Sequence, residues 1–193
     1  MGQYYIAVIL AEKGTAKAEY VRVYLRPHAY GEGAKLMEHS YLNSGFMNAI
    51  ENLIGPNGTF YRSRLVWAGD YADPEPELQT DIESGSESDC EDSQTLYDIA
   101  SESSREYERA STELLVDCQY IVNHTKKQYV DKKVCETEIH PLPLLVSEGN
   151  GRGGGDYSGS NEHLCGSWAR DVISMETQIP GGYEQLVCEF DEY

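Results

Sequence analysis

Two β-strand-like runs at the beginning of the chain constrain its fold more than any other feature. Residues 3–10 are rich in β-branched and aromatic side chains, and residues 18–25 alternate Tyr and Arg with Val and Leu. Gly14 and Thr15 lie between the runs and favour a turn. The sequence therefore predicts a fold that opens with a β-hairpin of two antiparallel strands.

The segment that follows has the periodicity of an amphipathic helix. Its apolar residues recur at spacings of three and four: Phe46, Met47, Ile50, Leu53 and Ile54. Asn43 or Ser44 can cap the start of this helix, and Gly55-Pro56-Asn57-Gly58 ends it. Residues 64–69 then predict a buried strand, and residues 95–107 a polar helix.

The second half of the chain predicts another hairpin. A strand over residues 114–122 leads to a turn at 124–127 and a return strand at 128–130. Pro141 and Pro143 exclude a central strand, so we expect an edge strand or an extended connection over residues 140–145.

The end of the chain completes the predicted sheet. Six glycines exclude regular structure over residues 149–159, and Pro180-Gly181-Gly182 separates two final strands at 167–175 and 183–190. Together these elements predict a single α+β domain over residues 1–193. Its sheet is expected to be mixed and mostly antiparallel, with two or three helices.

The negative charge of the chain is unevenly distributed. The formal net charge is −18, and residues 70–108 contain 14 acidic residues but one base, Arg105. Within this region, residues 75–93 are dominated by Ser, Glu and Asp and have too little apolar surface to offset the entropy of ordering. We expect a mobile acidic insertion there. The charge also disfavours direct binding to duplex nucleic acid.

Cysteine usage and the absence of targeting signals indicate a cytoplasmic protein. None of the five cysteines forms a C-x-x-C pair, which is typical of reduced thiols rather than of a disulfide framework or a zinc knuckle. The apolar run 6–11 is too short to span a bilayer and lacks a basic flank. Gly2 could suggest myristoylation, but Ile6 stands where Ser or Thr is required. We therefore expect no membrane partner.

The glycine-rich loop over residues 148–157, EGNGRGGGDY, is the sharpest candidate for ligand binding. Consecutive glycines let backbone N–H groups converge on an anion, and an arginine fork suits phosphate or carboxylate. The predicted ligand-binding residues are Asn150, Arg152, Gly153, Gly154, Gly155 and Asp156. The loop is neither a Walker loop nor a dinucleotide fingerprint. The alternative is a flexible surface loop.

Three histidines and an aspartate are the candidates for catalysis. His39, His124 and His140 each lie at a predicted strand end or turn with polar neighbours, and imidazole can act there as acid or base. Asp70 ends a predicted strand and could pair with Asp73. The alternative is that these residues have structural hydrogen bonds or cap turns. No H-x-x-x-H or H-x-H spacing occurs, so the sequence assigns no metal site, and it assigns no cofactor.

The chain resembles a family of uncharacterised microbial and phage-encoded proteins. The segments that carry the resemblance are GQYY at 2–5, KLMEHSY at 35–41, VWAGDYAD at 66–73, YIVNHTKKQYVD at 120–131, HPLPLL at 140–145, GNGRGGGDY at 149–157 and, less closely, GSWARDVI at 166–173. The resemblance implies a common fold but no established activity, so it assigns no catalytic residue.

Three functions are compatible with these features. The first is a binder of a nucleotide-like or other anionic small ligand, or an enzyme acting on one, with the histidines and Asp70 lining the cleft. The second is a non-catalytic acidic protein that binds a basic partner, for example an inhibitor of a host nucleic-acid-binding defence protein. The third is a structural or self-assembling component, suggested by the 15 tyrosines. The sequence leaves open whether the protein is an enzyme.

Overall fold

The computed structural model of the chain describes residues 2–12, 20–75, 94–107, 110–134, 137–150 and 157–191. The acidic insertion expected at 75–93 lies outside these residues apart from its first position, Glu75. Five of the predicted ligand-binding residues, Arg152 to Asp156, also lie outside them.

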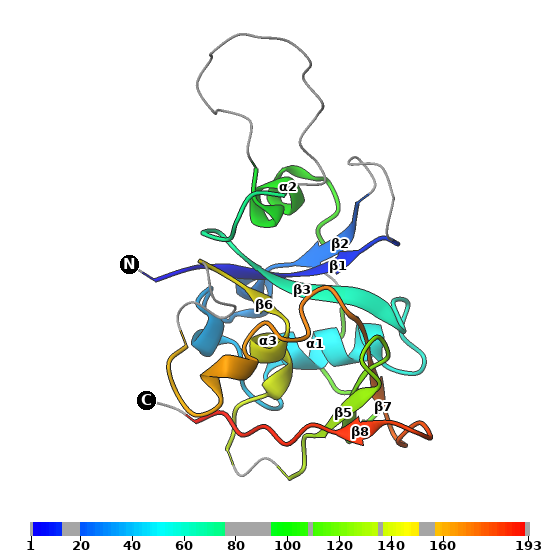
Figure 1. The fold of residues 1–193 in the computed structure, drawn as a ribbon. Coiled ribbons are helices and arrows are strands. Elements are labelled where there is room, and N and C mark those ends of the chain that lie inside the picture. The colour runs from blue at the N-terminus through cyan, green and yellow to red at the C-terminus, as the bar shows by residue number, and fades with distance from the viewer. Residues whose placement is uncertain are drawn as a thin grey trace, which may run out of the picture.

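One mixed sheet of eight strands organises the described residues (Figure 1). The strands are β1 (Tyr5–Leu10), β2 (Val21–Leu25), β3 (Ser63–Gly69), β4 (Tyr120–Asn123), β5 (Gln128–Asp131), β6 (Ser147–Glu148), β7 (Val172–Glu176) and β8 (Glu184–Gln185). Their order is β2-β1-β3-β7-β4-β5-β8, with β6 paired to β3. The β3–β6 and β5–β8 pairs are parallel and the others antiparallel. This arrangement confirms the predicted α+β class.

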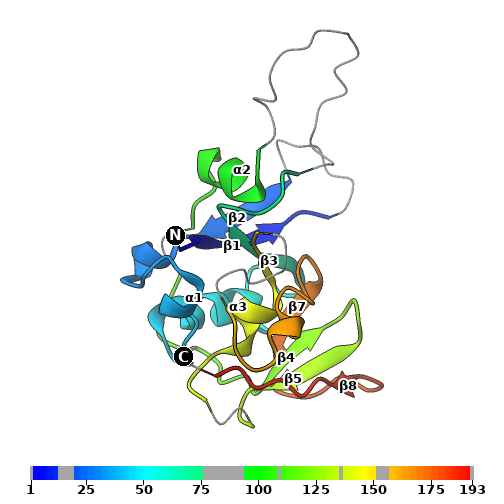
Figure 2. The same cartoon turned by 60° about the vertical axis from the view of Figure 1, so that its left-hand side comes forward.

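Helices cover both faces of the β1–β2–β3 part of the sheet (Figures 1 and 2). The helices α1 (Gly45–Ile54) and α3 (Pro141–Leu145) lie on one face, and α2 (Leu96–Glu102) lies on the other. The side chains of β3 therefore alternate between two buried clusters, with Leu65 and Trp67 in one and Val66 and Ala68 in the other. Two-sided burial explains why β1 is apolar along its whole length.

The predicted N-terminal hairpin and the predicted first helix are both confirmed. β1 and β2 pair antiparallel, with Ala7 opposite Leu25. The backbone N–H of Met47 donates to the Ser44 side chain, which is the N-cap of α1. The helix ends at Ile54, immediately before the Gly55-Pro56 turn.

Residues 141–145 form the short helix α3, so the expectation of an edge strand or an extended connection was wrong. The first N–H groups of a helix have no partner within the helix, which is why prolines are tolerated there. Both Pro141 and Pro143 lie in this first turn. The His140 side chain caps the helix by accepting from the N–H of Leu142 at 3.1 Å.

Several predicted elements are shorter in the structure. Residues 114–119 are not strand, because the side chain of Asn52 holds the preceding segment against α1. The helix predicted over 95–107 ends at Glu102, and the chain then covers the edge of β2, where Tyr107 N donates to Tyr24 O at 2.8 Å. The two strands predicted at 167–175 and 183–190 are present only as the shorter β7 and β8.

Candidate functional site

The parallel pairing of β3 and β6 brings two predicted parts of the site together. Trp67 is opposite Ser147 and Ala68 is opposite Glu148, so both strands end at the same edge of the sheet. Asp70 follows β3 at this edge, and Asn150 follows β6. We call this place the β3–β6 edge and define it by Gln3, Asp70, Glu148 and Asn150.

Hydrogen bonds to the start of the chain fix the β3–β6 edge. The carboxamide oxygen of Gln3 accepts from the hydroxyl of Tyr5 at 2.9 Å and from the backbone N–H of Asn150 at 3.4 Å. A Cβ atom at Gly69 would collide with this carboxamide, so glycine is required for the close approach. Asp70 accepts from the backbone N–H of Tyr4 at 3.0 Å and donates its own N–H to the carbonyl of Tyr4.

Arg170 binds two carboxylates beside the edge. Its Nε and Nη2 donate to the two oxygens of Glu148, each at 2.6 Å. Its Nη1 donates to Glu75 at 2.8 Å and Nη2 donates to the other oxygen of Glu75. Nη1 also donates to the hydroxyl of Tyr20 at 3.1 Å. A guanidinium has five N–H donors, so every donor of Arg170 is used.

Because all its donors are used, Arg170 holds Glu75 and Glu148 in position and has no N–H left to bind a ligand. Burial lowers the pKa of Arg170, but the hydrogen bonds and charges of Glu75 and Glu148 outweigh it and raise the pKa above its ordinary value. The backbone of Arg170 has a left-handed φ of 64°, and its N–H donates to Leu65 O at 2.8 Å. Sequence reasoning missed this role, because Glu75 and Glu148 lie 95 and 22 residues away along the chain.

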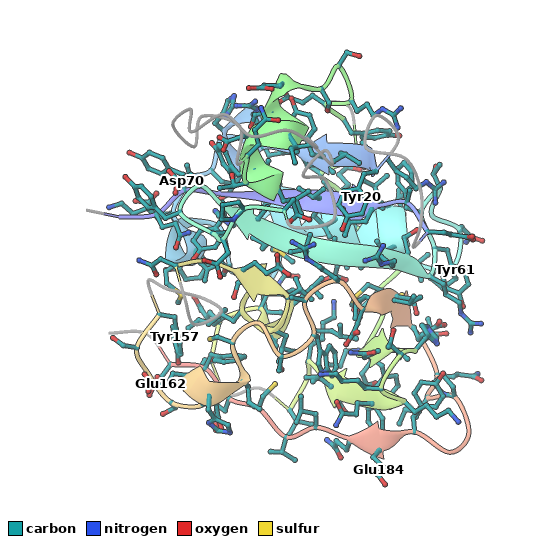
Figure 3. The ribbon with its side chains drawn as sticks, turned by 45° about the horizontal axis from the view of Figure 1, so that its top comes forward. Tyr20, Tyr61, Asp70, Tyr157, Glu162 and Glu184 are labelled. Carbon is teal, nitrogen blue, oxygen red and sulfur yellow. The ribbon has the colours of Figure 1, made fainter. Side chains whose placement is uncertain are left out.

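The far end of the glycine-rich loop is also anchored. The single hydroxyl proton of Tyr157 is shared between the Ser160 carbonyl oxygen at 2.8 Å and Asp191 Oδ1 at 3.0 Å, and the hydroxyl oxygen accepts from the Asp191 N–H at 3.1 Å. The ring of Tyr157 packs edge-on against Phe190. Tyr157 lies on the same side of the molecule as Asp70 in the view of Figure 3. The two flanks of residues 151–156 are thus held by Arg170, through Glu148, and by the C-terminal segment.

His39 lies in the core with both ring nitrogens hydrogen-bonded. Nδ1 lies 2.9 Å from the carbonyl of Gly33, to which it donates, and Nε2 accepts from Trp67 Nε1 at 3.0 Å. These partners require the neutral ring with the proton on Nδ1. Burial lowers the pKa of His39 to about 4. A fully buried, neutral imidazole with two protein partners is a residue with structural hydrogen bonds, which was the alternative to a catalytic role for His39.

His140 is buried in a cluster with Glu51 and Lys132. Because its Nδ1 accepts from Leu142 N, its Nε2 carries the proton and donates to Glu51 at 3.0 Å. Lys132 Nζ binds the same carboxylate at 2.7 and 2.6 Å. Burial lowers the pKa of His140. His140 therefore holds Glu51 and caps α3, and it has no exposed surface.

His124 belongs to a polar network at the opposite end of the sheet from Asp70. Its Nε2 lies 2.7 Å from Ser174 Oγ, which donates to Glu176 at 2.8 Å, and its Nδ1 lies 3.0 Å from the hydroxyl of Tyr183. Burial and then Arg62 lower the pKa of His124 against the opposing charge of Glu176. A serine–histidine contact can form a nucleophile pair, but Ser174 is fully buried and cannot reach a substrate.

The four predicted catalytic residues do not line one cleft, which corrects the expectation from sequence. His124 follows Asn123, which pairs with Ile173, and Ile173 pairs with Ser63 at the start of β3. Asp70 follows the last residue of β3, so the strand separates the two by about 20 Å. Figure 3 shows the two ends of β3 at opposite sides of the molecule, with Asp70 after its last residue and Tyr61 shortly before its first.

The described residues contain no group of three or more His, Cys, Asp or Glu side chains arranged to hold a metal ion. None of their helices is both long and apolar enough to cross a membrane.

The pKa of His39 predicts a loss of stability in mild acid. The unfolded chain takes up a proton near pH 6.5 and the folded chain near 4, so the free energy of unfolding falls as the pH drops through this window. The expected contribution is about 3 kcal/mol. In urea unfolding at pH 7, 5.5 and 4, the free energy of unfolding should fall less steeply with decreasing pH in His39→Gln than in the wild type. The exposed His163, changed to Gln, is the control, and equal declines in all three proteins would contradict the prediction.

Loss of the Arg170 guanidinium should strongly destabilise the fold. In Arg170→Met the side chain of Glu75, 2% exposed, loses its counter-charge, and we expect the free energy of unfolding to fall by about 3–5 kcal/mol. Arg62 also has a left-handed φ, of 55°, but its side chain is 51% exposed. Arg62→Met should therefore cost less than about 1 kcal/mol. Similar losses in guanidinium chloride unfolding of the two variants would refute the role of Arg170 as the counter-charge of the buried Glu75.

Comparison of the chain with protein-family models, curated proteins and solved structures finds no match. The resemblance to a family of uncharacterised proteins therefore stays a prediction from sequence.

Proposed function

We propose that the protein binds a small polar ligand, nucleotide-like or otherwise anionic, at the β3–β6 edge. The observation that carries the proposal is the shared end of two parallel strands, which brings Asp70 beside the entrance of the glycine-rich loop. In open α/β sheets, ligands bind outside the carboxyl ends of the parallel strands, and the β3–β6 pair gives this mostly antiparallel sheet one such end. Three of the polar segments each contribute one described residue to this edge: Gln3 of GQYY, Asp70 of VWAGDYAD and Asn150 of GNGRGGGDY.

Electrostatics determine how an anionic ligand would lie there. Arg170 is neutralised by Glu75 and Glu148, and with Asp70 the described part of the edge is negative. The anionic group of the ligand would therefore lie against the glycine-rich loop, where Arg152 and backbone N–H groups supply the positive field. Asp70 would face a hydroxyl or a base N–H of the ligand. The roles of Asn150 and of residues 152–156 remain predictions from sequence.

The proposal is for binding rather than for histidine catalysis. His39 and His140 are fully buried with their ring nitrogens engaged, and His124 lies about 20 Å from Asp70, as estimated from the length of β3. A general acid or base must come within hydrogen-bond reach of the reacting group. None of the three histidines meets this requirement for a ligand at the β3–β6 edge.

Calorimetric titration with a nucleotide panel tests the proposal. We expect at least one nucleoside mono-, di- or triphosphate to bind, Arg152→Ala to weaken it at least tenfold, and Asp70→Asn to change the preference among bases or sugars. Arg62→Ala, at the opposite end of β3, is the matched control and should bind as the wild type does. Absence of binding across the panel, or unaltered binding by Arg152→Ala, would rule the site out.

A second candidate is the acidic interaction protein, and the use of the basic side chains favours it. Several lysines and arginines of the described residues are committed to carboxylates, as in the pairs Lys132–Glu51, Lys133–Asp117 and Arg26–Glu106. Each such pair is neutral, so the net charge of −18 is carried by the remaining carboxylates. The negative field of these carboxylates attracts a basic protein. The acidic chain would then occupy the nucleic-acid channel of a host defence protein.

Removal of the acidic segment tests this second candidate. The N–H of Glu75 donates to Gln94 O at 3.0 Å, so residues 77–92 can be replaced by a short Gly-Ser link without moving Glu75 from Arg170. We expect binding of a 20-residue polylysine peptide at 50 mM NaCl to weaken at least tenfold. A variant of full length with every Asp and Glu of 77–92 changed to Asn or Gln should weaken equally. Binding that survives both changes would eliminate this candidate.

A further inference from the structure

A cavity distinct from the β3–β6 edge lies at the carboxyl end of α1. Its volume is about 180 Å³, several times the space that one water molecule needs. One wall is the end of α1 and the following turn, including Glu51, Pro56 and Asn57, and the other is the segment before β4, with Leu115, Val116 and Cys118.

The walls of the cavity are held in place by the carboxamide of Asn52. Its Nδ2 donates to the carbonyls of Ser111 at 3.0 Å and Glu113 at 2.8 Å, and its Oδ1 accepts from Leu115 N at 2.9 Å. Asn48, one helical turn earlier, donates to the carbonyl of Thr112 at 3.0 Å. The segment 111–115 is thus fastened along α1, and the cavity is formed without a ligand.

Glu51, one of the residues that line the cavity, has a buried carboxylate. The side chain of Glu51 is 3% exposed and accepts from Lys132 Nζ at 2.7 and 2.6 Å and from His140 Nε2 at 3.0 Å. Burial raises the pKa of Glu51, but His140 and Lys132 outweigh it and keep the pKa below its ordinary value. Glu51 is therefore ionised, and the charges of Glu51 and Lys132 cancel.

The remaining field in the cavity favours a cation. The last carbonyls of a helix carry a partial negative charge of about half an electron, and α1 has no basic residue in its last turn to offset it. The overall charge of −18 acts in the same direction. Pro56, Leu115 and Val116 supply an apolar surface suited to a carbon chain. We infer that the cavity binds a small aliphatic amine, with its ammonium group toward the α1 carboxyl end and its chain against these apolar side chains.

Three probes of one size and different charge test the inference. Backbone amide NMR shifts are followed during titration with n-butylammonium, butan-1-ol and butyrate. We expect n-butylammonium to shift the amides of residues 51–57 and 115–118 saturably, and butyrate to bind there at least tenfold more weakly. Equal affinity for the three probes, or shifts scattered over the acidic surface without saturation, would overturn the inference.

A cavity-filling variant with a matched control completes the test. Val116→Phe places a larger side chain in the cavity and should abolish the saturable shifts at residues 51–57. Val134→Phe makes the same change at a valine that is 64% exposed and outside the lining, and should bind as the wild type does. Binding unaffected by Val116→Phe would refute the site. Because the readout is local to α1, the result is independent of nucleotide binding at the β3–β6 edge.

Discussion

β3 is the strand on which the rest of the structure depends, because three other strands take their positions from it. β1 pairs along its whole length on one side. On the other side β7 pairs with its first residues and β6 with its last. This division makes the two ends of β3 chemically different: the β7 end leads to the His124 network, and the β6 end forms the edge with Asp70 and Asn150.

Buried and partly buried ion pairs hold the two candidate binding places in shape. Arg170 joins Glu75 to Glu148 next to the β3–β6 edge, and Lys132 with His140 holds Glu51, which lines the cavity. Pairs of this kind add little net stability, because removing the charges from water offsets much of their attraction. Their effect is geometric: breaking one leaves an uncompensated buried charge, so each carboxylate has one favourable position. In a chain of net charge −18, these few bases determine which acids can be buried.

The sequence predicted local structure well where short-range chemistry decides it. The N-cap Ser44, the spacing of Phe46, Ile50 and Leu53 and the Gly55-Pro56 turn all act within a few residues, and α1 has the predicted boundaries. Predictions failed where a distant contact overrode local preference. Residues 114–119 have the pattern of a strand but are tied to α1 through Asn52. Residues 141–145 form a helix because the side chain of His140 caps it and both prolines fall in its first turn. β6 is two residues long and has no pattern of its own.

The sequence by itself determined the fold class, the first hairpin, α1 and the polar segments worth examining, because hydrophobic period, capping and turn chemistry are local properties. Only the tertiary structure decided which polar segments meet. The parallel pairing of β3 and β6 places Asp70 and Asn150 at the same end of β3, and His124 lies at its other end. His39 and His140 are buried in the core. The tertiary structure also gave Arg170 its role, since a guanidinium finds its carboxylates by proximity in space, and that proximity follows from strand order rather than from any spacing along the chain.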